Sequence, residues 1–385
     1  MAHGKPEAFR IAVSDEVLAD LRDRLARTRF PDEIPDTGWE YGTNLAYLRE
    51  LVDYWRTKYD WRAQEKALNR FAHFQAKVDD FGVHFIHEKG KGPNPKPLLL
   101  IHGWPGSIYE FMEIIPMLTD PAAHGGDAKD SFTVIAPSLP GYGFSEHAKA
   151  RAMNIQAIAE LFHKLMTAVL GYDRYAVQGG DWGAAITSRI GEVHQPHLYG
   201  IHINMIAVGP AEGRNAPELT PEEKVFLGNA EKFRTHESGY QWIQGTKPQT
   251  LAYGLNDSPA GLAAWIVEKF RTWSDCKGQV ESSFTKDQLL TNVMIYWITQ
   301  TANSSTRLYY EARHHPWRLK PGTRIETPVG VALFPGELLL PPRHWAERAY
   351  NVKRWTQMPK GGHFAAMEEP ELLAEDIREF YRDLT

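Results

Sequence analysis

One aspartate stands where the local sequence would expose a nucleophile. Residues 179–183 read Gly-Gly-Asp-Trp-Gly, after the short apolar run 174–178 and before the helix-forming residues 184–186. A strand, a sharp turn and a helix of this kind lift a reactive side chain clear of a sheet. The carboxylate of Asp181 could displace a leaving group from saturated carbon, and the resulting ester could then be hydrolysed. These residues therefore predict alkyl transfer, with epoxides and alkyl halides as the obvious substrates.

Two helpers are expected downstream of this aspartate, in the chain order nucleophile, acid, histidine. His363 lies in Gly-Gly-His-Phe (361–364) near the C-terminus, where its imidazole could deprotonate water. Glu337 follows the predicted strand 329–334, where its carboxylate would orient that imidazole. A solvated loop glutamate is the alternative interpretation of Glu337. Other carboxylates are less well placed: Asp257, Glu311 and Glu347.

The loop His-Gly-Trp-Pro-Gly-Ser (102–107) follows the first buried strand. It can present the backbone N–H of Trp104, which would form an oxyanion hole with the N–H of Trp182. The two indole side chains then remain free to line a pocket. We expect the Trp104–Pro105 peptide bond to be cis, since such bonds occur almost only before proline.

Several other classes of site are excluded by residue type. The glycine-rich stretch 179–183 lacks the lysine and hydroxyl residue of a phosphate loop. His314 and His315 are adjacent, so their side chains point apart and do not suggest a metal site. We expect neither a cofactor nor a metal ion. A formal net charge of −5 argues against a nucleic-acid partner.

Cellular location is predicted from what the sequence contains. The first ten residues lack the apolar core of a signal peptide. The chain has no uninterrupted run of about 18 apolar residues that would span a bilayer. The single cysteine, Cys276, cannot form an internal disulfide, which fits a reducing compartment. We therefore expect a cytoplasmic protein.

The remaining patterns indicate how these residues are positioned. Helical spacing over 14–28, 44–59 and 61–71 predicts a helical leader of about 75 residues that precedes any sheet. Strand, turn and helix units then predict a right-handed, doubly wound and mostly parallel sheet, the α/β-hydrolase fold. We expect its strands at 84–87, 97–102, 132–136, 174–178, 199–205, 329–334 and 352–358, and helices at 154–170 and 364–384.

A mostly helical stretch interrupts this alternation and predicts a cap over the carboxyl edge of the sheet. The predicted division is an N-terminal helical segment at 1–78, a catalytic domain at 79–207 and 323–385, and a cap at 208–322.

Taken together, these motifs make the chain resemble the microsomal-type epoxide hydrolases, including the insect juvenile-hormone epoxide hydrolases and bacterial relatives. The likeness covers nearly the whole chain. Phe-Pro-Asp (30–32) through Trp39 resembles the wrapping segment peculiar to that family. Further matching motifs lie at 102–107, 179–183, 246–248, 255–259, 261–264 and 361–366. Membrane-bound relatives carry an N-terminal anchor, whereas this chain starts almost at the wrapping segment, so we expect no membrane anchor.

The resemblance implies two cap tyrosines that hydrogen-bond the epoxide oxygen. By motif, the first matches Tyr240 and the second Tyr309, with neighbouring Tyr310 as the alternative. Such donors suit the chemistry, because opening an epoxide develops an alkoxide that a phenol can protonate.

We therefore expect a cofactor-free epoxide hydrolase that forms a vicinal diol through an ester on Asp181. The resemblance implies a bulky lipophilic or aryl epoxide, either a xenobiotic or a natural-product intermediate. Beside Trp104 and Trp182, candidate residues to line the pocket and bind substrate are Phe144, Trp242 and Tyr310. The alternatives are a haloalkane or haloacid dehalogenase and a non-catalytic binding protein. The oligomeric state stays open, a homodimer included.

Overall fold

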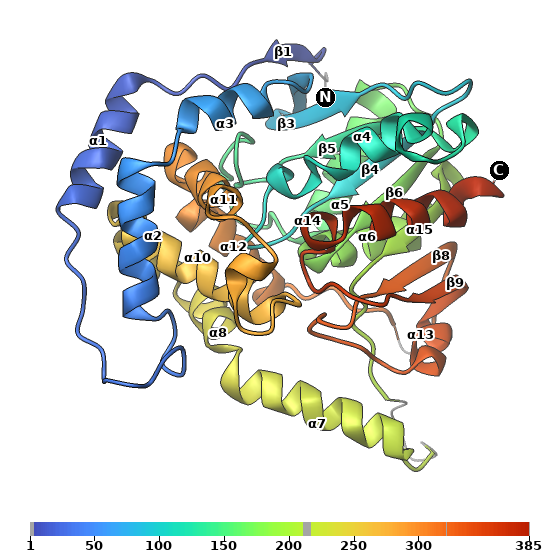
Figure 1. The fold of residues 1–385 in the computed structure, drawn as a ribbon. Coiled ribbons are helices and arrows are strands. Elements are labelled where there is room, and N and C mark those ends of the chain that lie inside the picture. Colours follow the sequence, from blue (N-terminus) through green and yellow to red (C-terminus); the bar gives the residue numbers. More distant parts are fainter. Residues whose placement is uncertain (1–3, 211–216, 321, 385) are drawn as a thin grey trace.

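The computed structural model describes residues 4–210, 217–320 and 322–384 of the chain. In this part of the chain, nine strands form one sheet in the order β1-β2-β3-β5-β4-β6-β7-β8-β9 (Figure 1). The strands are β1 (Glu7–Phe9), β2 (His73–Val78), β3 (Phe81–Glu88), β4 (Lys96–Ile101), β5 (Phe132–Pro137), β6 (Tyr175–Gly179), β7 (Leu198–Ile203), β8 (Ile325–Leu333) and β9 (Tyr350–Gln357). Strands β4 to β9 pair with one another in parallel. Strands β1, β2 and β3 pair antiparallel, and β3 joins the parallel part by an antiparallel pairing with β5.

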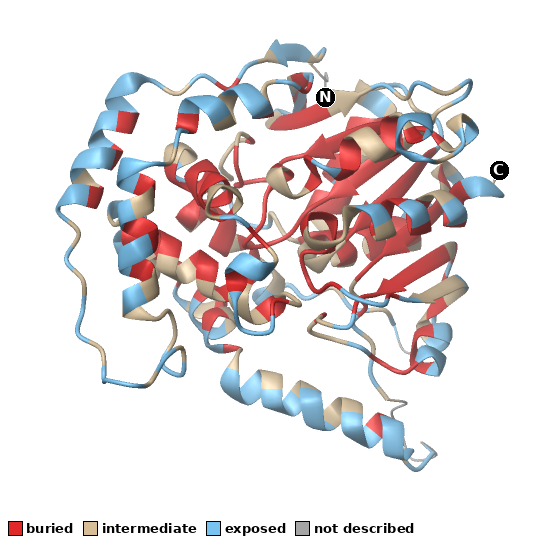
Figure 2. Cartoon of the chain, in the orientation of Figure 1, coloured by how far each residue is buried: buried red, intermediate tan, exposed pale blue. Residues whose placement is uncertain are grey.

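Helices cover both faces of the parallel part of the sheet. Helices α5 (Ile155–Lys164) and α6 (Asp181–Val193) pack together on one face, and α4 (Ile114–Thr119) packs with α15 (Pro370–Arg382) on the other. The central strands are consequently buried on both sides (Figure 2), which explains why β4, β5 and β6 read as apolar runs. The predicted doubly wound, mostly parallel sheet is confirmed.

The prediction that the N-terminal leader precedes any sheet is wrong. Strand β1 pairs with β2, so residues 7–9 form the edge of the sheet before the first helix begins. An edge strand of three residues carries too few positions for an alternating pattern, and its pairing with residues 73–75 is a tertiary contact. The helix expected at 364–384 is also divided, into α14 (Ala365–Glu368) and α15, which begins at Pro370.

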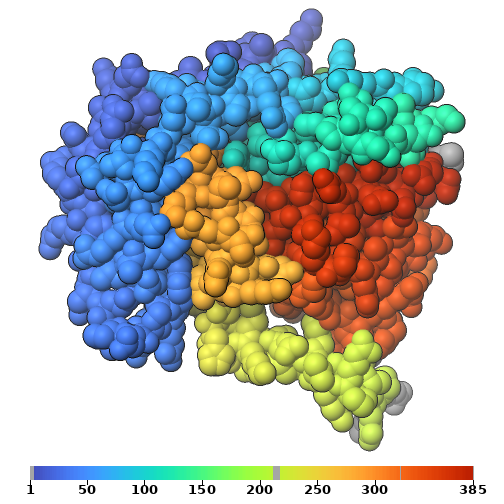
Figure 3. Space-filling model, in the orientation of Figure 1, coloured from blue at the N-terminus to red at the C-terminus, as the bar shows by residue number. Residues whose placement is uncertain are grey.

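The N-terminal helices are α1 (Asp15–Ala26), α2 (Leu45–Thr57) and α3 (Trp61–Leu68). Of these, α1 and α2 lie against the helices of the predicted cap (Figures 1 and 3). The cap helices are α7 (Pro221–His236), α8 (Gly239–Thr246), α9 (Pro248–Asp257), α10 (Pro259–Trp273), α11 (Lys286–Thr299) and α12 (Ala302–His314).

Polar side chains fasten the two segments together. The hydroxyl of Tyr54 donates to Asp287 Oδ1 at 2.9 Å, and Thr43 Oγ1 donates to the carbonyl of Ala264 at 2.8 Å. Arg24 Nη1 lies 2.7 Å from Asp257 Oδ1. The N-terminal segment therefore braces α9, α10 and α11 from outside.

Helix α7 differs from the other cap helices in its exposure. It extends away from the body of the molecule, and most of its residues are exposed (Figure 2). Its N-terminus is fixed by a capping box between Thr220 and Glu223. Among the helices of the described residues, none combines the length and the apolarity needed to cross a membrane.

Candidate active site

Asp181 lies at the sharp turn between β6 and α6. Its φ of +49° is in the left-handed region, which L-residues rarely adopt and which costs about 1–3 kcal/mol. The turn also needs a close approach to β4, because a Cβ on Gly183 would collide with the carbonyl of Ile101. The carboxylate is therefore held at the carboxyl end of the sheet by a strained turn, as the glycine spacing predicts.

His363 and Glu337 meet beside this carboxylate. His363 Nε2 lies 3.5 Å from Asp181 Oδ2, and its Nδ1 lies 2.7 Å from Glu337 Oε1. The backbone joins the two loops, since the N–H of Gly336 donates to the carbonyl of Gly361 at 2.9 Å. Glu337 is buried, so the interpretation as a solvated loop residue does not fit. The three residues thus form one chain of side chains, carboxylate to imidazole to carboxylate.

The loop 102–107 brings a backbone donor to Asp181. The N–H of Trp104 donates to Asp181 Oδ1 at 2.8 Å, and the Trp104–Pro105 peptide bond is cis, as expected. Trp182 is the second residue of α6, and amides in the first turn of a helix have no acceptor within that helix. The N–H of Trp182, the residue directly after Asp181, therefore has no acceptor inside α6.

Two buried tyrosines from the cap pack on the tryptophans beside Asp181. Tyr240 on α8 stacks on Trp104, with ring centroids 5.2 Å apart and planes within 10°. Tyr309 on α12 makes T-shaped ring contacts with Trp104 and Trp182, with ring centroids 5.7 and 4.7 Å apart. The two phenol rings lie 5.7 Å apart. Segments from β4, α6, α8 and α12 thus converge on Asp181.

Charge and burial raise the pKa values of three groups at the site. Burial disfavours the charged imidazole of His363, but the negative charges of Glu337 and Asp181 outweigh it and raise its pKa well above the ordinary value. Burial raises the pKa of Tyr240 and of Tyr309, and the charge of Asp181 adds to both shifts. In the free protein the imidazole and both phenols therefore hold their protons at neutral pH.

Three of the candidate lining residues lie elsewhere. Phe144 packs between Phe9 and His84 on the β1 side, with centroid distances of 5.5 and 5.2 Å. Trp242 is 49% exposed and lies under Arg313, and Tyr310 stacks on His314. The prediction that these three residues line the site is wrong. For Trp242 and Tyr310 the reason is helix geometry: Trp242 lies two residues from Tyr240, and Tyr310 lies one residue from Tyr309, so each points to another face of its helix than the neighbouring tyrosine.

Sequence reasoning missed other residues at the site. Glu110, in the short helix Ile108–Phe111, lies beside Asp181 and His363. Asn292 and Tyr296 of α11 bind the backbone of loop 102–107. For Asn292 and Tyr296 no local signal exists, because they reach the loop only through the fold.

Comparisons with known proteins place this geometry in a family. Residues 6–111 match the family described as "Epoxide hydrolase N terminus", and residues 96–223 match "alpha/beta hydrolase fold". A Stigmatella aurantiaca protein with the provisional name of an epoxide hydrolase is 46% identical over 377 residues, covering 98% of this chain and 84% of that protein. "Epoxide hydrolase 1" of Sus scrofa is 40% identical over 403 residues, covering 97% and 87%.

A solved structure agrees. The juvenile hormone epoxide hydrolase of the silkworm Bombyx mori superposes with a TM-score of 0.90 at 34% identity, covering 99% of this chain and 96% of that one. The predicted α/β-hydrolase fold is confirmed, and epoxide hydrolysis is favoured over both alternatives. The chain belongs to the epoxide hydrolase family of α/β-hydrolases, enzymes that hydrolyse the ether bond of an epoxide.

Proposed function

We propose that the enzyme works through a covalent ester on Asp181, in two steps. The observation that carries this proposal is the placement of Asp181 between a histidine and a pair of buried phenols. His363 Nε2 lies 3.5 Å from one carboxylate oxygen, while Tyr240 and Tyr309 pack on the indoles of Trp104 and Trp182. A nucleophile, a base and two acids are what ring opening followed by hydrolysis requires.

Ring opening is the first step. An oxygen of Asp181 forms a bond to an epoxide carbon, the C–O bond of the ring breaks, and the oxygen takes a proton from Tyr240 or Tyr309. The raised pKa values of both phenols support this role, because the tyrosines stay protonated and can donate at neutral pH. The product is a hydroxyalkyl ester of Asp181.

Hydrolysis is the second step. Water adds to the ester carbonyl carbon while His363 Nε2 takes its proton, and Glu337 stabilises the imidazolium. The oxyanion is held by the N–H groups of Trp104 and Trp182. Formation of the ester removes the charge of Asp181, which is one cause of the raised His363 pKa, so this pKa falls. The imidazolium then gives its proton to the phenolate that ring opening left, and the neutral imidazole becomes the base. As the adduct collapses, the leaving diol oxygen takes the proton back from His363, and the remaining proton of the water passes from the Asp181 carboxyl to the imidazole, which restores the starting state.

The substrate we propose is a bulky lipophilic or aryl epoxide. The side chains around Asp181 are the aromatic rings of Trp104, Trp182, Tyr240 and Tyr309, with Trp273 packed 5.0 Å from Tyr240. Aromatic rings offer large apolar area and edge-to-face contacts to another ring. A small polar epoxide would not use these walls.

An isotope experiment tests the ester. Enzyme in excess over styrene oxide is allowed one turnover in ¹⁸O water, and the label is located by mass spectrometry. Because water attacks the carbonyl carbon of the ester, ¹⁸O should enter the Asp181 carboxylate and the first diol should carry unlabelled oxygen from Asp181. Label in that first diol would contradict the ester mechanism. A second turnover is the control, since ¹⁸O should then pass from Asp181 into the diol.

A further inference from the structure

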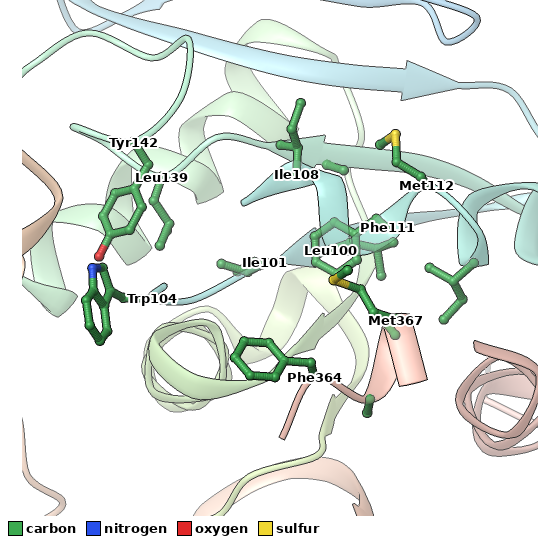
Figure 4. Packing of buried hydrophobic residues seen from close by; sticks show 14 of the residues in the cluster. Leu100, Ile101, Trp104, Ile108, Phe111, Met112, Leu139, Tyr142, Phe364 and Met367 are labelled. Carbon is green, nitrogen blue, oxygen red and sulfur yellow. The ribbon is translucent and has the colours of Figure 1, made fainter. Parts of the chain in front are cut away.

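A small cavity lies beside Asp181, on the side of His363. Its volume is about 20 Å³, and its polar wall is formed by Glu110, Gln178, Asp181, Asn204 and His363. The apolar wall includes Ile101, Trp104, Phe111 and Phe364, whose packing Figure 4 shows. About 10–15 Å³ and two to four polar partners suffice to hold one water molecule. The cavity therefore has the size and the polar lining of a site for a single water.

Glu110 enters this cavity from the loop that carries Trp104. Its carboxyl folds back over the loop, since a Cβ on Gly106 would collide with Glu110 Oε1. A larger residue than Gly106 would therefore displace the Glu110 carboxyl from this position. The side chain keeps some exposed surface and lines the cavity together with His363 and Asp181. No step of the proposed function uses this carboxyl group.

We propose that Glu110 holds the water molecule that attacks the ester on Asp181. The inference rests on the proposed function, which supplies the ester. The water would lie between the Glu110 carboxyl and His363 Nε2, within reach of the carbonyl carbon of Asp181.

The electrostatics of Glu110 fit this role. Burial raises the pKa of Glu110 to about 8 and the charge of Asp181 adds to the shift, while His363 and the Gly103 amide oppose it. At neutral pH the carboxyl is therefore largely protonated, so no second negative charge faces Asp181. A protonated carboxyl still has a carbonyl oxygen that accepts a hydrogen bond.

The water oxygen forms a bond to the Asp181 carbonyl carbon, and one of its protons passes to His363 Nε2. The second O–H donates to the carbonyl oxygen of Glu110 and keeps its proton, so Glu110 orients the water without changing its own protonation. Collapse of the adduct breaks the bond to the alkyl oxygen, which takes the proton from His363.

Single-turnover kinetics with styrene oxide separate the two steps. Ester formation and decay are followed by rapid quenching and intact-protein mass. Glu110→Leu removes the acceptor at similar volume and should leave the ring-opening rate unchanged, while ester decay slows by about tenfold, the usual effect of one lost hydrogen bond. Glu110→Gln keeps a carbonyl oxygen and should restore most of the decay rate. Glu113→Gln, an exposed glutamate three residues later, is the matched control.

Two results would overturn the role of Glu110 and leave the two-step mechanism standing. One is ester decay at the wild-type rate in Glu110→Leu, and the other is an equal fall of ring opening and decay, which would mark a purely structural residue. A crystal structure adds a second readout, because the wild type should hold a water between Glu110 and His363 that Glu110→Leu lacks. Absence of any ester in the wild type would instead contradict the two-step mechanism, and the role of Glu110 would fall with it.

Discussion

Asn292, on cap helix α11, holds the backbone of the loop that carries Trp104. Its Nδ2 donates to the carbonyl of Pro105 at 2.8 Å, and its Oδ1 accepts from Ser107 Oγ at 2.8 Å. One helical turn later, the hydroxyl of Tyr296 donates to the carbonyl of Gly106 at 2.6 Å. All of these groups are buried. The cap thus helps to set the position of the N–H that meets Asp181.

Replacing Asn292 by alanine should both destabilise the protein and slow the reaction. The buried Ser107 hydroxyl and Pro105 carbonyl would lose their partner, which costs about 1–3 kcal/mol in the free energy of unfolding. Freedom in loop 102–107 should lower kcat, because the Trp104 N–H would no longer be held at Asp181. Urea denaturation and steady-state kinetics measure the two effects. Asn351→Ala, on β9 with one backbone hydrogen bond at 2.9 Å, is the control and should change neither greatly.

His363→Gln should trap the ester. Ring opening needs only Asp181 and the phenols, whereas loss of a general base slows the hydrolytic step by about 10² to 10⁴. The intact mass of the variant should therefore rise by the mass of the epoxide, and peptide mapping should place the adduct on Asp181. An unmodified mass after prolonged incubation with substrate would count against the assignment. His314→Gln, outside the site, should show no adduct.

Removal of the phenol hydroxyls of Tyr240 and Tyr309 should slow ring opening, the first step. Tyr240→Phe combined with Tyr309→Phe should slow ester formation by about 10² to 10⁴, the usual contribution of a positioned acid, and leave ester decay nearly unchanged. Each single variant should fall between the double variant and the wild type. Tyr310→Phe is the matched control, because that ring stacks on His314 away from Asp181. A normal ring-opening rate in the double variant would exclude the tyrosines as acids.

The pH dependence of ring opening follows from the same tyrosines. An ordinary tyrosine loses its proton near pH 10. Burial and the charge of Asp181 raise the pKa of both Tyr240 and Tyr309, so the protonated form persists as the pH rises through 10. Single-turnover ester formation should therefore stay level from neutral pH to about 10 and decline only above it. A decline centred at or below about 10 would mean that the phenols are not shielded in this way.

The site residues that the sequence predicted are mostly those whose conformation depends on residues close by in the chain. The Asp181 turn needs glycines around it, and the conformation with φ of +49° is made within a few residues. His363 stands in a glycine turn whose place in the chain order of the fold marks it. Tyr240 and Tyr309 had no such local signal, and were matched only through the motifs around them.

Errors arose where a prediction needed the direction of a side chain. Trp242 and Tyr310 neighbour site tyrosines in sequence, but helix geometry turns them to other faces. Strand β1 was missed because three residues become a strand only by pairing with β2.

By itself, therefore, the sequence determined the parallel part of the sheet, the turn that presents Asp181, and the downstream residues Glu337 and His363 that are expected to assist it. Only the tertiary structure decided which neighbours surround that carboxylate. Asn292 lies 187 residues from Pro105, and Glu110 lines the same cavity as the distant His363, so neither relationship could be predicted from local spacing. The physical reason is that turns and strands depend on backbone conformation within a few residues. A buried cavity instead depends on how four distant segments pack against one another.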